Sequence, residues 1–165
     1  FQIWINLPSS KKLCDPSYRE YEESDIPNQK VDGAGSIKII AGRTDSGHNG
    51  AIIGIETNPL FLDVNLLPNS AFSQSIAADH SAFIFVIEGS LLVESIEGKN
   101  KLETSQLGVL GSGEKVNVSV RDVESRFLLL SAARLNEEVV RCGPFVMNTL
   151  EEIQKAIRDF RSGNI

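Results

Sequence analysis

The sequence has very few of the residues from which metal sites and active sites are usually built. Only two histidines occur, His48 and His80, and neither has a second histidine at the H-x-H or i,i+4 spacing that lets two imidazoles share a metal. A first-row metal site needs three or four converging ligands, so His80 could at most be a lone ligand. His48 lies in the turn-rich stretch SGHNG, where we expect it to face solvent. We therefore expect this chain to hold no metal or cofactor of its own and to contain no catalytic residue.

Cysteine is equally scarce. Cys14 and Cys142 form no C-x-x-C or alternating Cys/His pattern of the kind a zinc site needs. We expect both to be reduced thiols in a cytosolic protein, with a structural or incidental role rather than a reactive one. No serine stands in a G-x-S-x-G elbow, so the sequence offers no nucleophile and base pair.

Positive charge and long apolar runs are lacking as well. Lys and Arg number 16 against 22 Asp and Glu, which gives a formal net charge of -6 and disfavours direct binding to phosphate backbones. No apolar run approaches the roughly 20 residues that span a bilayer, and no basic-then-apolar signal segment occurs. We expect no contact with nucleic acid or membrane, and a cytoplasmic location that could extend to the nucleus in a eukaryote.

Two glycine-rich stretches look like phosphate-binding loops, but their surroundings are wrong. In GVLGSGEK, residues 108–115, Glu114 separates the last glycine from Lys115, and a strand pattern follows where a helix N-terminus would be needed. DGAGS, residues 32–36, also precedes a strand. We interpret residues 108–115 as a hairpin turn.

What the sequence does contain is a series of short apolar runs closed by turn residues. Their spacing and their β-branched and aromatic content predict an all-β sandwich or barrel over residues 31–135. In residues 60–66 apolar and polar positions alternate, whereas residues 83–87 and 127–130 are apolar throughout, as in central strands covered on both faces. The predicted strands are residues 36–41, 51–57, 60–67, 82–88, 91–96, 115–120 and 126–132.

The two ends of the chain have a different character. Residues 1–7 alternate in the rhythm of a strand, so we expect further chain before Phe1, and residues 8–29 have the composition of a surface connector. Near the other end, Thr149 and Glu152 form a capping box. Apolar residues then recur at helical spacing until Gly163, and this short helix should bury Leu150, Ile153, Ile157 and Phe160 against a barrel.

Four segments together resemble the pirin family, two-barrel members of the cupin superfamily. They are FQIWINLP at 1–8, PSYRE at 16–20 with DIP at 25–27, FLDVNLLPNSAFSQSI at 61–76, and GPFVMNTLEEIQKAIRDFRSG at 143–163. The resemblance covers nearly the whole chain, but it matches only the C-terminal half of such a protein. It implies a cupin-type jelly-roll barrel with a short C-terminal helix. Residues 1–30 would be the last strand of an absent N-terminal cupin plus a linker, 31–135 the C-terminal cupin, and 136–165 an arm with the helix.

The resemblance also implies where the chemistry of the family lies. Pirin-like proteins hold iron in the first barrel, through an H-x-H pair, a further His and a Glu. Counted back from Glu88-Gly89, the paired histidines would fall on Ser75 and Ala77 here, and the later ligands around Val116 and Val118. None of these is a ligand, so the resemblance transfers no metal site to this chain.

Three functions remain open from the sequence. The chain could support an iron-dependent quercetin 2,3-dioxygenase whose chemistry lies in the N-terminal cupin, or it could be the protein-interaction module of an iron-sensitive transcriptional co-regulator. It could also be an independent small-molecule-binding cupin. The partners expected are the N-terminal cupin half of the same protein, a further protein, and a second copy associating through residues 1–7, whose strand edge would otherwise stay unpaired.

Overall fold

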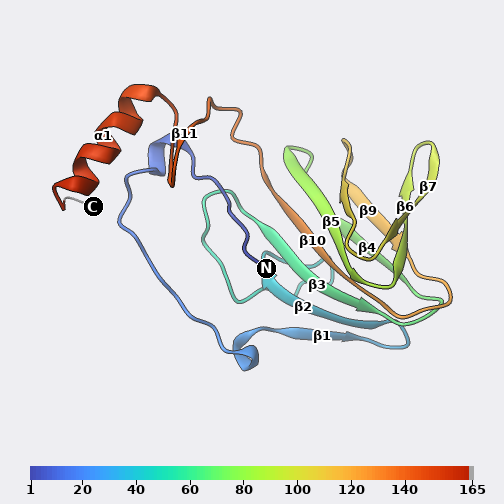
Figure 1. Ribbon diagram of the computed structural model, residues 1–165. Coiled ribbons are helices and arrows are strands. Elements are labelled where there is room, and N and C mark those ends of the chain that lie inside the picture. The colour runs from blue at the N-terminus through green and yellow to red at the C-terminus, as the bar shows by residue number, and fades with distance from the viewer. Residues whose placement is uncertain (164–165) are drawn as a thin grey trace. The chain divides into compact units, whose positions relative to one another are not determined.

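The computed structural model describes residues 1–163, and its chain forms two compact units (Figure 1). The barrel unit is Arg19–Arg134. The terminal unit combines Phe1–Tyr18 with the end of the chain from Leu135 onward. Sequence reasoning assigned these two ends of the chain to separate parts, and the structure places them in one unit. The assignment of residues 1–30 to another cupin stays a prediction.

The barrel unit is built from two antiparallel sheets that face one another (Figure 1). The six-stranded sheet has the order β1-β2-β3-β10-β5-β8, and the four-stranded sheet has the order β4-β9-β6-β7. This arrangement confirms the predicted all-β jelly roll. The strands are β1 (Asn28–Val31), β2 (Gly35–Ala41), β3 (Leu60–Leu66), β4 (Ala71–Ser75), β5 (His80–Glu88), β6 (Ser90–Ser95), β7 (Gly98–Glu103), β8 (Leu107–Val109), β9 (Lys115–Ser119) and β10 (Ser125–Ala133), preceded by the 3-10 turn η2 (Glu23–Asp25).

The core lies between the two sheets. Alternation along β3 buries Leu60, Leu62, Val64 and Leu66 and leaves the intervening residues half-buried, as the sequence predicts. The sheets meet through aromatic rings, since Phe72 of β4 contacts Phe127 of β10 edge to face with ring centroids 5.9 Å apart.

The two uninterrupted apolar runs are central strands, as predicted. β10 pairs with both β3 and β5, and β5 pairs with both β10 and β8. Both faces of β10 are buried, because Phe127 and Leu129 enter the core while Leu128 and Leu130 on the opposite face are also covered. A strand with two covered faces has no polar side to show in the sequence.

The strand predictions need correction, because one predicted strand is absent and β1, β4, β7 and β8 were not predicted. Residues 51–57 form no strand, and only an isolated bridge joins Ile52 to Ala41. Gly54 has a φ of +75°, which interrupts the extended conformation in the middle of that apolar run. In contrast, β7 has the polar sequence GKNKLE and forms a strand because it pairs along its whole length with β6.

The interpretation of residues 108–115 as a hairpin turn is also wrong. β8 pairs with β5 in the six-stranded sheet, whereas β9 pairs with β4 and β6 in the other sheet. The segment therefore connects the two sheets. The next element, β9, is a strand as predicted, so no helix N-terminus follows this segment to bind a phosphate.

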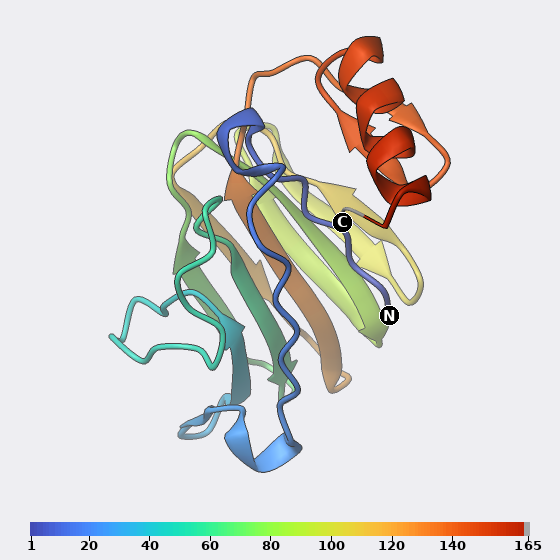
Figure 2. The same cartoon turned by 90° about the vertical axis from the view of Figure 1, so that its left-hand side faces the viewer.

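The terminal unit contains one hairpin and one helix, which lie side by side in Figures 1 and 2. β11 (Val140–Cys142) pairs with β12 (Phe145–Met147), α1 (Leu150–Arg161) follows, and the 3-10 turn η1 (Ser9–Lys11) lies in the N-terminal segment. Residues 1–7 have no strand partner within residues 1–163, and their pairing with an N-terminal cupin or a second copy stays a prediction. A strand needs ladder partners for its backbone groups.

The helix begins as predicted but packs differently. Thr149 Oγ1 accepts a hydrogen bond from the Glu152 amide, and Glu152 accepts one from the Thr149 amide, which completes the capping box. The helix packs on β12 and β11 through Ile153, which is 3% exposed, and Ala156. Leu150 and Phe160 are 63% and 65% exposed, so the four expected residues are not all buried within the described chain, and their burial against a further barrel stays a prediction. A two-stranded hairpin is too narrow to cover the whole apolar face of α1.

Candidate functional site

The inner face of β4 and β9 is the place where the resemblance would put metal ligands. Phe72, Gln74 and Ile76 point into the core from β4 and the residue that follows it, and Val116 and Val118 do so from β9. Gln74 stands opposite Val116 in the antiparallel ladder, and Phe72 stands opposite Val118. This face therefore presents four apolar side chains and one amide.

Ser75 and Ala77, the expected equivalents of the paired histidines, are exposed. Side chains alternate between the two faces of a strand, so these residues cannot share a site with Val116 and Val118, which are buried. The inward-facing residues of this segment are Gln74 and Ile76, one position before each expected equivalent. Counting residues back through the loop between β4 and β5 does not preserve which face a side chain occupies.

The inward residues do not fit an iron ion. Iron sites use imidazole, carboxylate or thiolate ligands, and the apolar side chains here have no donor atom. The one polar side chain, Gln74, has a neutral amide, and its oxygen accepts a hydrogen bond from the Asp45 backbone amide at 3.3 Å. Across residues 1–163, no three His, Cys, Asp or Glu side chains gather closely enough to hold a metal ion.

Gln74, near the end of β4, has a structural role that the sequence did not predict. Its amide is 3% exposed, and Nε2 donates to Asp45 Oδ1 at 3.0 Å and to the Ser75 carbonyl at 3.1 Å. The other oxygen of Asp45 accepts from the Ser75 amide at 2.9 Å and from its hydroxyl at 3.0 Å. The buried amide is thereby satisfied and attaches the loop after β2 to β4. The alternation of Phe72, Gln74 and Ile76 with serines was the available signal.

His48 lies in the same loop and faces solvent, as predicted. Its Nδ1 is 3.2 Å from the Ser46 hydroxyl, which donates to the side-chain oxygen of Gln29 at 2.9 Å. A recess of about 430 Å³ beside these residues is lined by Pro27, Asn28, Gln29, Lys30, Ile39 and His48. The recess contains the imidazole of His48 and the ammonium group of Lys30 but no nucleophile, so its residues form no catalytic arrangement.

His80 has a hydrogen-bonding partner within the barrel. It opens β5, is half-buried, and its Nδ1 lies 3.2 Å from the hydroxyl of the buried Ser131 on β10. The contact ties the beginning of one central strand to the end of its neighbour, where Ala133 is opposite His80.

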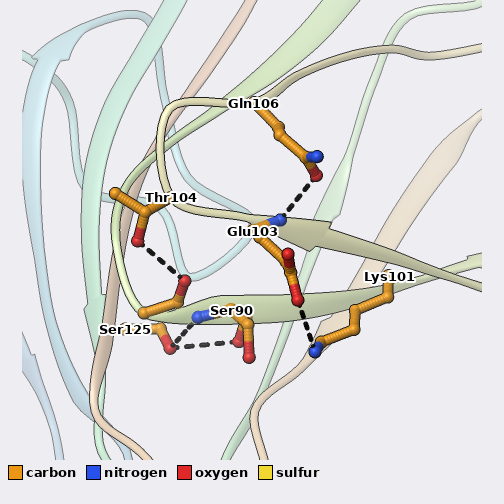
Figure 3. Close-up of polar contacts among 7 residues, drawn as sticks. Ser90, Lys101, Glu103, Thr104, Gln106 and Ser125 are labelled. Atoms are coloured by element: carbon orange, nitrogen blue, oxygen red, sulfur yellow. Dashed lines mark hydrogen bonds and ion pairs between the residues drawn. The ribbon is translucent and has the colours of Figure 1, made fainter.

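The opposite end of the barrel is closed by hydrogen bonds around Ser125 (Figure 3). Ser125 is fully buried, and its hydroxyl accepts from the Ser90 amide and donates to the Ser90 carbonyl, each at 3.0 Å. Thr104 donates to the Gly89 carbonyl at 3.1 Å. These contacts connect the turn between β5 and β6 with the start of β10 and the end of β7. The Ser125 and Thr104 hydroxyls are thereby hydrogen-bonded to backbone groups of the protein.

In the terminal unit, Glu137 holds three segments together. Its carboxylate accepts from the Ser9 amide at 2.8 Å, from the Ser9 hydroxyl at 3.2 Å and from Asn148 Nδ2 at 2.9 Å. The hydrogen bond from the Ser9 backbone is the main reason that the pKa of Glu137 lies below its ordinary value, followed by the bond from Asn148. Cys14 and Cys142 are also in this unit, and both are exposed without a disulfide.

Of the helices within residues 1–163, none has the length and apolar character needed to cross a membrane.

Comparison with known proteins places these features in a family. The model of the Pirin C-terminal cupin domain matches residues 61–165. The chain belongs to the pirin family. Human pirin is 36% identical over 168 residues, and the pirin-like protein of Caulobacter vibrioides is 34% identical over 163 residues. The crystal structure of quercetin 2,3-dioxygenase from Acinetobacter baumannii superposes with a TM-score of 0.84 at 29% identity.

The chain spans about half the length of these pirin relatives. The human match covers 98% of this chain but 55% of that protein, and the Caulobacter match covers 99% and 57%. The Acinetobacter dioxygenase gives the same proportions, 98% and 55%. The resemblance seen in the sequence, to the C-terminal half of a pirin, is confirmed.

Proposed function

We propose that this chain is a metal-free cupin domain that supports an iron-binding N-terminal cupin in a quercetin 2,3-dioxygenase-like pirin. The observation that carries the proposal is the inner face of β4 and β9. Ser75 and Ala77, where the resemblance would put the paired histidines, carry no imidazole, and on the inner face Ile76, Val116 and Val118 are apolar while the amide of Gln74 is hydrogen-bonded to Asp45.

The supporting role follows from what this inner face does. Phe72 packs on Phe127 of the opposite sheet, so the inner face of β4 and β9 contributes to the hydrophobic core. Burying such side chains stabilises the fold by about 1.5 to 3 kcal/mol each. A barrel of this kind is a rigid body against which a second cupin can be held.

The dioxygenase activity is inferred from the name of a relative, and we propose it for the complete protein only. A solved structure covering 98% of this chain at 29% identity is a quercetin 2,3-dioxygenase, and this chain matches 55% of it. The iron and the turnover of a quercetin-like flavonol are therefore assigned to the remaining part of such a protein.

Two measurements test the proposal. Elemental analysis of the purified chain should find no stoichiometric iron, zinc or copper, and the chain alone should not consume quercetin under air. A polypeptide that also carries the N-terminal cupin should bind iron and consume quercetin, and deleting the barrel unit from it should lower the melting temperature of the iron-binding part. Stoichiometric iron in this chain alone, or turnover by it, would overturn the proposal.

A further inference from the structure

The recess beside His48 has hydrogen-bond donors along its wall and no acidic side chain. All six of its lining residues belong to the barrel unit, and none of them is Asp or Glu. Its volume of about 430 Å³ lies within the range of pockets that take small organic molecules. The chemistry of the wall therefore decides which class of small molecule would fit.

The edge strand β1 contributes backbone donors to this wall. β1 is the outermost strand of the six-stranded sheet and pairs only with β2 (Figure 1). The Ile39 amide donates to the Pro27 carbonyl at 2.8 Å, so Pro27 and, two residues later, Gln29 direct their backbone groups toward β2. In an antiparallel ladder these directions alternate, which turns the amides of Asn28 and Lys30 away from β2. Both residues line the recess, so two backbone donors with no ladder partner stand at its wall.

The side chain of Gln29 contributes two further donors. The hydroxyls of Ser46 and Thr44 donate to Gln29 Oε1 at 2.9 Å and 3.3 Å, and Thr44 itself is buried. These contacts engage the amide oxygen, and an amide held in this way keeps the two N–H groups of its nitrogen. No residue of the described chain accepts a hydrogen bond from Gln29 Nε2. The amide is thus fixed from behind by the loop after β2 and retains its donors.

The charges of the recess are positive. Lys30 and His48 line it, and the Ser46 hydroxyl contacts His48 through Nδ1, which leaves Nε2 as the ring nitrogen available to a ligand. The acid in the same loop is used elsewhere, because Asp45 accepts from Gln74 and from the Ser75 amide. A positive hollow in a chain whose net charge is -6 attracts an anion locally, against the field of the whole molecule.

The kind of anion follows from the rest of the wall. Pro27 is exposed and offers an apolar ring, and Ile39 lies fully buried beneath the recess. A phosphate site is usually built from a helix N-terminus or an arginine fork, and neither lines this recess. One ammonium group, one imidazole and neutral N–H donors beside an apolar ring suit a carboxylate attached to an apolar group.

We propose that the recess between β1 and the loop after β2 binds a small apolar carboxylate. Gln29, Lys30 and His48 hold the carboxylate, and Pro27 contacts the apolar group. The inference is independent of the proposed function, because it concerns the barrel unit alone and needs neither iron nor an N-terminal cupin.

Titration of the ¹⁵N-labelled chain with benzoate tests the proposal. Benzoate combines a carboxylate with a flat apolar ring, benzamide is its uncharged counterpart, and inorganic phosphate is an anion without an apolar part. Proton–nitrogen correlation spectra should show saturable shifts for the Asn28 and Lys30 amides and for the Gln29 side-chain amide. Benzamide and phosphate should each bind at least about fivefold more weakly than benzoate.

Three variants assign the binding to these side chains. Gln29→Glu keeps an oxygen for the Ser46 and Thr44 hydroxyls but replaces the two donors with a negative charge, so saturable binding should be lost. Lys30→Gln and His48→Ala should each weaken benzoate binding about threefold to tenfold. The matched control is Lys101→Gln on β7, which removes the same charge from an exposed lysine outside the recess and should change the affinity less than about twofold. Circular dichroism should show unchanged folding in all four variants, because Lys30, His48 and Lys101 are exposed and Gln29→Glu preserves the shape of the side chain.

Several outcomes would overturn the inference. Equal binding of benzoate and benzamide would mean that the donors do not select a carboxylate, and tighter binding of phosphate would mean that the recess selects charge alone. Unchanged benzoate binding by Gln29→Glu, or an equal loss in Lys30→Gln and Lys101→Gln, would place the site elsewhere. The absence of saturable shifts with benzoate would also refute it. None of these results bears on the supporting role of the barrel, which the iron and quercetin measurements test separately.

Discussion

The turn glycine between β5 and β6 offers a direct test of the barrel geometry. Gly89 has a φ of +79°, a left-handed conformation that other residues adopt at a cost. A Cβ at this position would also lie 2.3 Å from Ser125 Oγ and 2.6 Å from the Glu124 carbonyl oxygen. Gly89→Ala therefore combines backbone strain with a collision against the buried Ser125 contacts of Figure 3.

A second turn glycine separates these two effects. Gly33, in the turn between β1 and β2, has a similar φ of +68°, but a Cβ there would meet nothing within 4 Å. Gly33→Ala should lower the free energy of unfolding by about 1 to 2 kcal/mol through left-handed strain alone. Overpacking adds about 1 to 3 kcal/mol at Gly89, so Gly89→Ala should lower it by about 2 to 5 kcal/mol.

Thermal and urea unfolding, followed by circular dichroism, measure the difference. For a chain of this length each kcal/mol shifts the melting temperature by about 2 to 4 °C, so the two variants should differ by several degrees. The slope of the urea transition should stay constant if only native stability changes. Equal losses for Gly33→Ala and Gly89→Ala would refute the packing of Ser125 against the turn.

Three further predictions concern the helix, the register of β4 and the Glu137 contacts. Ile153→Ala should destabilise α1 by about 2 to 5 kcal/mol, whereas Leu150→Ala should change its stability by less than about 0.5 kcal/mol. Amide exchange in the helix measures both changes, and equal effects would contradict the packing described. In a variant without the two native cysteines, Ser75→Cys should react quickly with a thiol reagent and Gln74→Cys slowly, and the reverse order would restore the register first expected. The lowered pKa of Glu137 means that its contribution to stability is present above the ordinary glutamate pKa and is lost as the pH falls through the lowered value. The Ser9 amide should lose protection from exchange in that acidic range, and Glu137→Gln should remove this pH dependence.

The long alternating strand β3 could be predicted from the sequence, whereas the shorter alternating strand β4 was missed and β7, which is held by pairing alone, could not be predicted. Residues 60–66 alternate and form β3 within one residue of the predicted boundaries. β7 has no apolar face of its own, and its pairing with β6 is a tertiary property that a single sequence does not show. Residues 51–57 show the opposite situation. They form an apolar run that predicts a strand, but the backbone conformation of Gly54 prevents one from forming.

The position of the inward-facing residues at the candidate site could not be predicted from the sequence. The absence of ligand residues could be read from the sequence, since it depends only on which residues are present. The inward pair, Gln74 and Ile76, depends on the face that each residue occupies after a loop, and an error of one residue reverses that face. The contact of residues 1–18 with the end of the chain in one unit was not predicted at all, because it brings together residues from opposite ends of the chain.

The inner face of β4 and β9 explains how this scaffold holds its shape without metal ligands. A metal ion bound by residues from several strands would link those strands through coordinate bonds, and its ligands would need polar surroundings to hold them in place. Here the same face links the strands through apolar contact, because Phe72 meets Phe127 across the barrel and Val116 and Val118 join the same cluster. The single polar residue that remains, Gln74, has every hydrogen bond directed to the protein itself, at the loop that carries Asp45. A face arranged in this way stabilises the barrel through apolar packing and through the hydrogen bonds that Gln74 makes within the protein.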